Sequence, residues 1–473
     1  MVINIRSNSF VKRDLRFELR KGEKIMGKKV VIIGCGGTGG PCAVMAKKLD
    51  PSMDITIIRE EENFLTRCAT PYISVGDTTV DQSVKDDSIF FASGIKLVQD
   101  RVTKINRNNK TVTTASGEVF PYDKLVFATG ARAVAPPIPG VDLKGIFLLR
   151  TSRDSVNILD WINRRRVREA TVVGAGAIGI EMAYLMATRG INITLVEMLD
   201  HVLPISLDQD MADPIEEYMK EKGIDLRVKE KLTRIEGNER VEGIQLSSGE
   251  KKEADIVILS AGVRTNIELA MEAGLEIGER NGVKVNRYLQ TSDPDIYAAG
   301  DVIEYEHFIT GRPSLGQVRP NAVIGGRIIA KNIVGYQVEF PPILNNFVTK
   351  FFEKSVASTG LTESAAKKEG LEVIATKNTS RSKHIMIEGW KPYTVKLVFD
   401  KNSKNIIGGQ ILSDSDCMVK QIDVITLAIR SRMTALDMTT IRNAGQPELS
   451  SEPSAEPITI ASEEAFRQLY PIS

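Results

Sequence analysis

The sequence has few of the residues that build disulfide scaffolds, metal centres and membrane spans. It contains 4 cysteines and 3 histidines in 473 residues, and no apolar run reaches the roughly 18 residues of a membrane-spanning helix. The histidines are scattered, and the cysteines lack the paired spacing of a zinc site. We therefore expect a cytoplasmic protein with no disulfide framework, no metal and no membrane association.

An excess of charge of one sign is also missing. Lysine and arginine number 62, and aspartate and glutamate 61, so no overall field draws the chain to nucleic acid or to an anionic membrane. Small molecules are the expected partners. The length suggests about three domains. Residues 1–26 alternate charged and apolar types without the apolar block of a secretory signal, so we treat them as an N-terminal extension.

The first glycine-rich stretch follows an apolar, β-branched run. Residues 29–33 predict a buried strand, 41–49 a helix and 54–58 a second strand. This order brings backbone N–H groups and a helix N-terminus close to a pyrophosphate, so it predicts a dinucleotide site. An acid about 20 residues further on should bind a ribose; Glu60 is the candidate, unless Arg59 closes the strand. The loop residues are Gly34, Gly36, Thr38 and Gly39.

The same design recurs later in the chain. Residues 170–173 predict a strand, 180–188 a helix and 192–197 another strand, which Glu197 closes. A carboxylate there binds a ribose 2′-hydroxyl and repels a 2′-phosphate, which favours NADH over NADPH. Two such units in one chain predict two bound nucleotides. The loop residues are Gly174, Gly176, Ile178 and Gly179.

Three more apolar strands end in turns that contain glycine. An aspartate at such a strand end can accept hydrogen bonds from a polyol, and Asp301 follows one of them. A helix near residues 321–332 can present its N-terminus to the same ligand. After Pro341 and Pro342 the pattern changes to strands with polar alternation and an amphipathic helix over 419–433, which favours an interface role. The turn residues are Thr129, Gly130, Gly262, Gly300 and Asp301.

Cys68 lies between the two glycine loops, within residues 63–77. A lone cysteine is usually a small buried hydrophobe, but here two nucleotide sites flank it. If the side chain of Arg67 turns toward the sulfur, it would lower the thiol pKa and favour the thiolate. The other cysteines are expected to pack or to have no chemistry: Cys35, Cys42 and Cys417.

In their order, these motifs resemble those of the FAD-dependent pyridine nucleotide-disulfide oxidoreductases, specifically the branch with one active cysteine. That branch includes coenzyme A-disulfide reductases, NADH oxidases and peroxidases, and NAD(P)H polysulfide reductases. The likeness covers about residues 28 to 460. It depends on five stretches: Gly34–Gly39, Cys68–Tyr72, Phe127–Ala131, Gly174–Glu181 and Tyr297–Asp301.

The resemblance implies an α/β fold with two Rossmann-like dinucleotide-binding domains, for FAD and for NAD(P)H, and an α+β C-terminal dimerisation domain. It implies that Asp301 holds the FAD ribityl chain, that Glu181 lies near the contact of flavin and nicotinamide, and that the protein is a homodimer. The expected divisions are an FAD domain at 27–150 and 280–338, an NAD(P)H domain at 151–279 and a dimerisation domain at 339–473.

The resemblance also implies an enzyme that passes electrons from NAD(P)H through FAD to Cys68, and on to a small disulfide, coenzyme A disulfide or polysulfide. Ile73 stands where two-cysteine reductases have their second cysteine, so one sulfur would cycle between thiolate and an oxidised form. Two alternatives stay open. One is an NADH oxidase or peroxidase that uses a Cys68 sulfenic acid. The other is an NAD(P)H reductase of a small redox protein such as rubredoxin.

The chain departs from relatives that reduce coenzyme A disulfide. They carry two tyrosines where this chain has Met386 and Ile387, and a tyrosine or histidine near the end where it has Gln446 ahead of a proline. Both proton donors are therefore missing, and the physiological acceptor stays open. Lys47 and Lys48 match a basic pair that lies near the substrate phosphates in coenzyme A-binding relatives, although lysines on a helix are more often just solvated.

Overall fold

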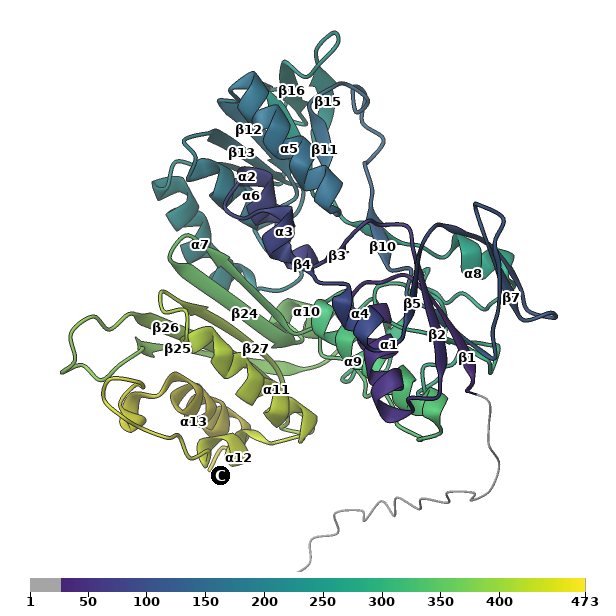
Figure 1. The fold of residues 1–473 in the computed structure, drawn as a ribbon. Coiled ribbons are helices and arrows are strands. Elements are labelled where there is room, and N and C mark those ends of the chain that lie inside the picture. Colours follow the sequence, from purple (N-terminus) through teal and green to yellow (C-terminus); the bar gives the residue numbers. More distant parts are fainter. Residues whose placement is uncertain (1–26, 473) are drawn as a thin grey trace, which may run out of the picture.

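The computed structural model describes residues 27–472, so the predicted N-terminal extension lies outside the described residues. Figure 1 shows three lobes, each built on its own five-stranded sheet. Two of these sheets are parallel and the third is antiparallel. Within the part of the chain that the structure describes, no helix combines the length and the apolar character needed to cross a membrane.

The first lobe is centred on β1 (Lys29–Ile33), whose last four residues are buried. It pairs in parallel with β2 (Asp54–Arg59) on one side and β9 (Lys124–Phe127) on the other. The outer strands are β5 (Lys96–Gln99) and β20 (Ile296–Ala298). Since β20 comes after the whole second lobe in sequence, the chain returns to the first lobe to complete its sheet.

Two helices of the first lobe pack together beside this sheet, α1 (Gly39–Leu49) and α9 (Arg319–Val334). A Cβ atom at Gly326 of α9 would lie 2.3 Å from the carbonyl oxygen of Thr38. Only glycine permits so close an approach. The middle of α9 is thereby held against the first glycine loop.

The second lobe repeats this arrangement. The central strand β12 (Glu169–Val173) pairs in parallel with β13 (Asn192–Glu197) and β18 (Ile256–Leu259), and α6 (Ala177–Ala187) follows the glycine loop. The prediction of two Rossmann-like units is confirmed. The edge strands are β14 (Asp225–Val228) and β11 (Ile146–Leu148).

Each nucleotide unit also carries a three-stranded antiparallel sheet, which the chain inserts between β5 and β9 in the first unit and between β14 and β18 in the second. In the first lobe its strands are β6 (Val102–Asn106), β7 (Thr111–Thr114) and β8 (Val119–Pro121). In the second lobe they are β15 (Leu232–Glu236), β16 (Gly243–Leu246) and β17 (Lys251–Glu253).

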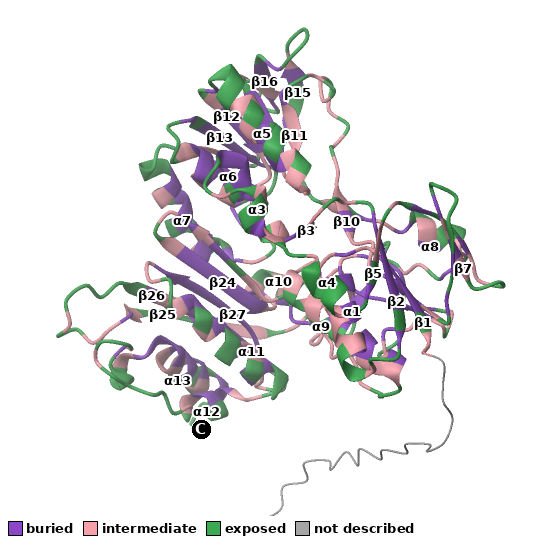
Figure 2. Cartoon of the chain, viewed as in Figure 1, coloured by how far each residue is buried: buried purple, intermediate pink, exposed green. Residues whose placement is uncertain are grey.

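The third lobe is an antiparallel sheet covered by helices. Its strands, in spatial order, are β23 (Phe347–Phe351), β24 (Lys354–Gly360), β27 (Ile406–Ser413), β26 (Pro392–Asp400) and β25 (Val373–Arg381). The central strand β27 is buried over its whole length (Figure 2). The helices packed against the sheet are α11 (Ile422–Arg430) and α13 (Pro457–Leu469), with α12 (Ala435–Thr439) beside α13.

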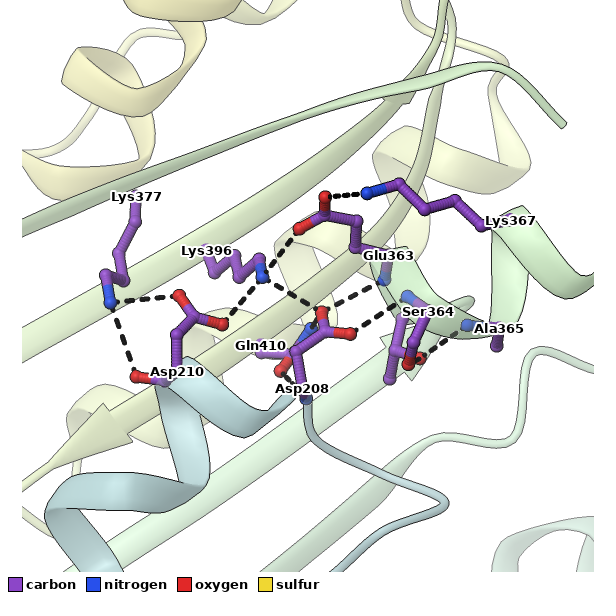
Figure 3. A network of polar contacts seen from close by, with 10 residues as sticks. Asp208, Asp210, Glu363, Ser364, Ala365, Lys367, Lys377, Lys396 and Gln410 are labelled. Carbon is purple, nitrogen blue, oxygen red and sulfur yellow. Dashed lines mark hydrogen bonds and ion pairs between the residues drawn. The ribbon is translucent and has the colours of Figure 1, made fainter. Parts of the chain in front are cut away.

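A buried ion-pair network joins the second lobe to the third (Figure 3). The Lys396 side chain on β26 is only 6% exposed, and its ammonium lies 3.1 Å from Asp208, 2.7 Å from Asp210 and 2.9 Å from Glu363. Both aspartates lie at the start of α7 (Gln209–Glu221) in the second lobe. A buried charge is tolerated when it is paired in this way.

Asp208 strengthens the same junction through the backbone. Its carboxylate accepts hydrogen bonds of 3.0 Å from the N–H groups of Glu363 and Ser364, at the start of α10 (Glu363–Lys368). Gln410 on β27 donates to this carboxylate at 2.6 Å. A carboxylate from one lobe thus caps a helix of the other.

Candidate active site

Cys68 lies in a short 3-10 turn, η1 (Arg67–Ala69), between β3 (Phe64–Leu65) and α2 (Thr70–Val75). The Thr70 hydroxyl donates to the Arg67 carbonyl oxygen at 2.8 Å and braces the turn. Gly76, with a φ of 80°, then ends the helix in the left-handed conformation. Cys68 itself is exposed.

The helix that follows Cys68 packs on the second lobe (Figure 1). Ser155, on α5 (Ser152–Arg165), donates its hydroxyl to the Thr70 carbonyl oxygen at 3.0 Å. Beyond α2, Asp77 forms an ion pair with Arg189, just after α6. The Cys68 turn therefore lies where the two nucleotide units meet.

The four cysteines are free, and they differ in exposure. Burial raises the pKa of both Cys35 and Cys42 to about 12, so these thiols stay protonated near neutral pH and act as packing residues. Cys417 is exposed but lies in the third lobe, ahead of a short 3-10 turn. Cys68 is thus the exposed thiol at the junction of the nucleotide units.

The guanidinium of Arg67 makes other contacts than the one the sequence suggested. It donates to a carboxylate oxygen of Glu61 at 2.5 Å and to the carbonyl oxygen of Arg150 at 2.9 Å. The Arg67 guanidinium is therefore held by Glu61 and Arg150, and not by a contact with the Cys68 sulfur. Arg67 acts here as a brace of the turn.

Arg150 extends this chain of contacts, and the sequence analysis missed it. Its guanidinium lies 2.6 Å from the carboxylate of Asp301, and a Cβ atom at Gly130 would lie 4.0 Å from it. The Nε atom of Arg150 is buried without a hydrogen-bond partner in the described residues. Arg67 and Arg150 together connect the Cys68 turn to Asp301. No local pattern marks Arg150, because its partner lies 151 positions away.

The first glycine loop has the shape that a pyrophosphate needs. A Cβ atom at Gly34 would lie 2.3 Å from the carbonyl oxygen of Ala128, and one at Gly39 would lie 2.0 Å from that of Gly34. Nothing lies within 4 Å of a Cβ atom built at Gly36. The loop is therefore closed at its first and last glycines and open at the middle one, where a ligand approaches the backbone.

The second loop has the same geometry. A Cβ atom at Gly179 would lie 1.8 Å from the carbonyl oxygen of Gly174, whereas Gly176 faces open space. Ile178 is partly buried against the core of this lobe. Gly262, at the end of β18, has a φ of 120° and also has nothing within 4 Å. Both loops therefore fit a dinucleotide.

The turns at the ends of β9 and β20 meet the first loop. Thr129 exchanges two hydrogen bonds with Asn266, of 3.1 and 2.9 Å, which hold the turn at Gly130. A Cβ atom at Gly300 would lie 2.5 Å from the hydroxyl oxygen of Thr38. The turns at Gly130 and Gly300 thus lie beside the first glycine loop.

Glu197 and Glu181, the two acidic candidate residues of the second nucleotide unit, have different hydrogen-bond partners. Glu197 is buried, and its carboxylate accepts hydrogen bonds from the N–H groups of Ala175 at 2.7 Å and Leu199 at 2.9 Å. Glu181 accepts a 2.9 Å hydrogen bond from the hydroxyl of Thr349 on β23. Burial raises the pKa of Glu181, and the bond from Thr349 opposes this rise. The sequence analysis missed Thr349, which belongs to the third lobe.

The strand end of the first unit differs from that of the second. The N–H of Gly34 donates to Ile58, and the N–H of Gly174 donates to Val196, so the residue after each acceptor holds an equivalent place. In the second unit that residue is Glu197, and in the first it is Arg59. Arg59 closes β2, as the alternative interpretation of the sequence had it, and Glu60 lies exposed beyond the strand.

The basic pair on α1 is divided. Lys47 is half-buried and donates to the carbonyl oxygen of Met53 at 2.6 Å, whereas Lys48 is exposed.

Of the two residues that stand in the tyrosine positions, Met386 is 66% exposed on a loop of the third lobe.

Known proteins resemble the chain over most of its length. The family Pyridine nucleotide-disulphide oxidoreductase matches residues 28–324, and the family's dimerisation domain matches residues 347–454. An NADH oxidase of Methanocaldococcus jannaschii is 34% identical over 450 residues, which is 93% of this chain and 99% of the relative. An NAD(P)H coenzyme A polysulfide/persulfide reductase of Pyrococcus horikoshii is 34% identical over 87% of this chain and 93% of its own.

Solved structures of similar proteins point to the same family. The NAD-dependent persulfide reductase of A. fulgidus has a TM-score of 0.89 and 30% identity, covering 93% of this chain and 83% of that one. The predicted cofactors, FAD and NAD(P)H, are those that the family uses. The chain therefore belongs to the pyridine nucleotide-disulphide oxidoreductase family.

Proposed function

We propose that this enzyme uses Cys68 to pass electrons from NAD(P)H to a small disulfide, persulfide or polysulfide. The observation that carries the proposal is the place of the exposed Cys68 turn, at the junction of two nucleotide units and joined to Asp301 through Arg67 and Arg150. A redox-active sulfur needs access to the substrate on one side and to an electron donor on the other.

The chain's own residues suit this chemistry. Bound FAD supplies the step that accepts a hydride from NAD(P)H and releases two electrons. The thiolate of Cys68 attacks one sulfur of the substrate, forms a mixed disulfide and releases the other sulfur as a thiolate. Two electrons then break the mixed disulfide and restore the Cys68 thiolate. In sum, NAD(P)H, one proton and one disulfide become NAD(P)⁺ and two thiols.

The cofactor sites follow from the two loops. We assign FAD to the first unit, with Thr129, Gly130, Gly300 and Asp301 at its flavin side, and NAD(P)H to the second. Glu197 favours NADH, because its charge repels a 2′-phosphate. Glu181 lies on the helix that follows the second loop and is assigned to the nicotinamide side. The divisions at 27–150 with 280–338, 151–279 and 339–473 stay predictions, as does a cytoplasmic location.

We also propose a homodimer, which the matched dimerisation domain supports. Coenzyme A disulfide stays among the substrates because a coenzyme A disulfide reductase of Staphylococcus aureus is 26% identical over 434 residues. We assign the phosphates of coenzyme A to Lys48, because it is the exposed lysine of the basic pair. Lys47 instead donates a hydrogen bond to the carbonyl oxygen of Met53.

An NADH oxidase is the second candidate. It is supported by the relative from Methanocaldococcus jannaschii that carries this name and aligns over nearly the whole chain. In that reaction peroxide would oxidise the Cys68 thiolate to a sulfenic acid with release of hydroxide, and two electrons and one proton would then reduce the sulfenic acid to the thiolate with release of water. The third candidate function is reduction of a small redox protein, a reaction that does not need Cys68.

Anaerobic titration with NADH, followed by visible absorbance, separates these candidates. The wild type should consume about two NADH per flavin, one for the flavin and one for oxidised Cys68, and the Cys68→Ser variant about one. Disulfide, polysulfide, peroxide and air, added in separate samples, then identify the fastest acceptor. Cys417→Ser is the matched control, because Cys417 is also exposed but lies in another lobe. Full disulfide turnover by Cys68→Ser would overturn the proposal.

A further inference from the structure

A strand of the third lobe contacts a carboxylate of the second nucleotide unit. Thr349 on β23 donates its hydroxyl to Glu181 on α6 at 2.9 Å, across 168 positions of the chain. Thr349 is only 5% exposed. Within residues 27–472 this is the one hydrogen bond that the Glu181 carboxylate accepts. Since β23 lies in the matched dimerisation domain, a residue of that domain orients an acid of the coenzyme unit.

The Thr349 hydroxyl is held in place by the packing of its strand. Phe351 and Phe352 lie where β23 turns back into β24. Their rings contact Tyr184 on α6, at centroid distances of 6.2 and 5.1 Å. They also contact Tyr218 on α7, at 6.2 and 6.4 Å. A β-branched side chain has few χ1 rotamers, so a fixed strand also fixes the direction of this hydroxyl.

Glu181 faces the junction of the two nucleotide units. Its helix α6 packs on α2, the helix that follows Cys68. Burial raises the pKa of Tyr72 on α2, and the nearby charges of Glu181 and Cys68 add to this rise. Tyr72 is thus close to both groups, and Glu181 lies on the side of α6 that faces the Cys68 helix.

The charged groups on the elements packed against α6 are paired elsewhere. These groups are Glu169 on β12, Glu197 on β13 and Lys350 on β23, and their partners are Asn192, backbone N–H groups and Asp416. The other titratable side chains there are the phenols of Tyr72 and, on α6 itself, Tyr184. Burial raises the pKa of Glu181, and the hydrogen bond from Thr349 lowers it by favouring the ionised form. Thr349 therefore opposes the effect of burial on this carboxylate.

We infer that Thr349 is a positioning residue of the coenzyme site, which directs the Glu181 carboxylate toward the nicotinamide ring and keeps it ionised there. The ring is neutral in NADH and positively charged in NAD⁺, because the hydride that passes to FAD carries two electrons with one proton. An ionised carboxylate beside the ring therefore favours NAD⁺ over NADH, and favours departure of the hydride. The inference rests on the proposed place of the nicotinamide beside Glu181, and it is independent of Cys68.

The test measures binding to the FAD-loaded enzyme, not turnover. Its ligands are NAD⁺ and tetrahydro-NADH, a neutral analogue that cannot donate a hydride, and calorimetry between about pH 5 and 8 gives their dissociation constants. In the wild type the preference for NAD⁺ should rise roughly tenfold as Glu181 ionises. Thr349→Val keeps the shape of the side chain but removes the donor, so this rise should occur at higher pH. Thr349→Ser keeps a hydroxyl and should restore the wild-type curve.

Thr376→Val is the matched control, because Thr376 is 4% exposed in the same lobe and its hydroxyl donates to Ala461 at 2.7 Å. It should follow the wild type. Thr349→Ala serves where valine disturbs folding. The inference is overturned if removal of the Thr349 hydroxyl leaves the curve in place, or if the serine variant is displaced as far as the valine variant.

Glu181→Gln separates this inference from the coenzyme assignment. With no charge to titrate, this variant should show a low preference for NAD⁺ that does not change with pH. A wild-type curve in Glu181→Gln would remove the nicotinamide from Glu181 and overturn both the assignment and the inference. A flat curve in Glu181→Gln with an unshifted curve in Thr349→Val would overturn the role of Thr349 alone. Failure of the Cys68 proposal would leave all these constants unchanged.

Discussion

At the scale of one residue, our proposal assigns the coenzyme preference to Glu197, whose carboxylate is fixed by the N–H groups of Ala175 and Leu199. We expect Glu197→Gln to raise the ratio of kcat/KM for NADPH over NADH roughly tenfold, a change of about 1.4 kcal/mol, since the charge that repels a 2′-phosphate is removed. Steady-state kinetics with both coenzymes measure this. Glu216→Gln removes another buried glutamate of the lobe, one bonded to Val202, and should leave the ratio unchanged.

Glu181 predicts a dependence of stability on pH. Burial raises its pKa above 4.5 in the folded state, so the folded protein holds this proton more tightly than the unfolded chain does. This contribution to stability is present below pH 4.5 and is lost as the pH rises through the raised pKa. Glu181→Gln should therefore be about 1 kcal/mol more stable than the wild type at neutral pH. Urea unfolding at several pH values tests this, and a gain that does not grow with pH would contradict it.

The sequence predicted the glycine positions of the candidate site and missed two of its polar residues, Arg150 and Thr349. Glycine loops depend on contacts within one strand, turn and helix, so a short pattern identifies them. Arg150 and Thr349 contact Asp301 and Glu181 across 151 and 168 positions, and no local pattern encodes such a contact. The direction of Arg67 likewise depends on distant Arg150.

At the scale of an element, different glycines of the first loop serve folding and cofactor binding. Gly39→Ala would place a Cβ atom 2.0 Å from a backbone oxygen, which should cost about 3 kcal/mol of stability. Gly36→Ala meets nothing within 4 Å, so the free energy of unfolding should stay within about 1 kcal/mol while FAD affinity falls at least about tenfold. Urea unfolding of flavin-free protein and FAD titration measure the two effects. Equal losses of stability in both variants would contradict this separation.

Element boundaries show what periodicity misses. The helix predicted over 419–433 is a 3-10 turn (Met418–Gln421) followed by α11, which ends at Arg430. The chain reverses just beyond α11, where Arg432 has a φ of 52°, and apolar spacing carries no information on such a turn. The strand predicted to end at Ile58 or Arg59 extends to Arg59, whose side chain is buried by pairing with Asp87.

At the scale of the whole molecule, Lys396 fastens the second lobe to the third. Lys396→Met leaves buried Asp208 without its cation and should lower the free energy of unfolding by about 3 kcal/mol. Chemical unfolding and limited proteolysis between the lobes measure the loss. Lys377→Met is the matched control, because Lys377 is 41% exposed and pairs with Asp210 at the surface. An equal loss in both variants would contradict a special role for Lys396.

The same network predicts weakening in acid. The folded protein lowers the pKa of Asp208, Asp210 and Glu363 from 3.8, 3.8 and 4.5, mainly because hydrogen bonds and Lys396 outweigh the opposing effect of burial. A lowered carboxyl pKa contributes stability above its unfolded value and loses it as the pH falls through the folded value. We expect the second and third lobes to separate below about pH 4 in the wild type, and the variant Lys396→Met to show a shallower acid transition. Domain-resolved hydrogen exchange follows this, and identical acid transitions would contradict it.

The Cys68 helix belongs to the first lobe by sequence and to the second by packing, since Ser155 holds it across 85 positions. During refolding, the reactive turn can reach its final geometry only after both lobes have formed their cores. The rate at which Cys68 acquires its native reactivity toward a thiol reagent therefore reports lobe docking, a later event than the return of helical signal. A fragment that ends before α5 would contain Cys68 but lack Ser155, which holds the Cys68 helix.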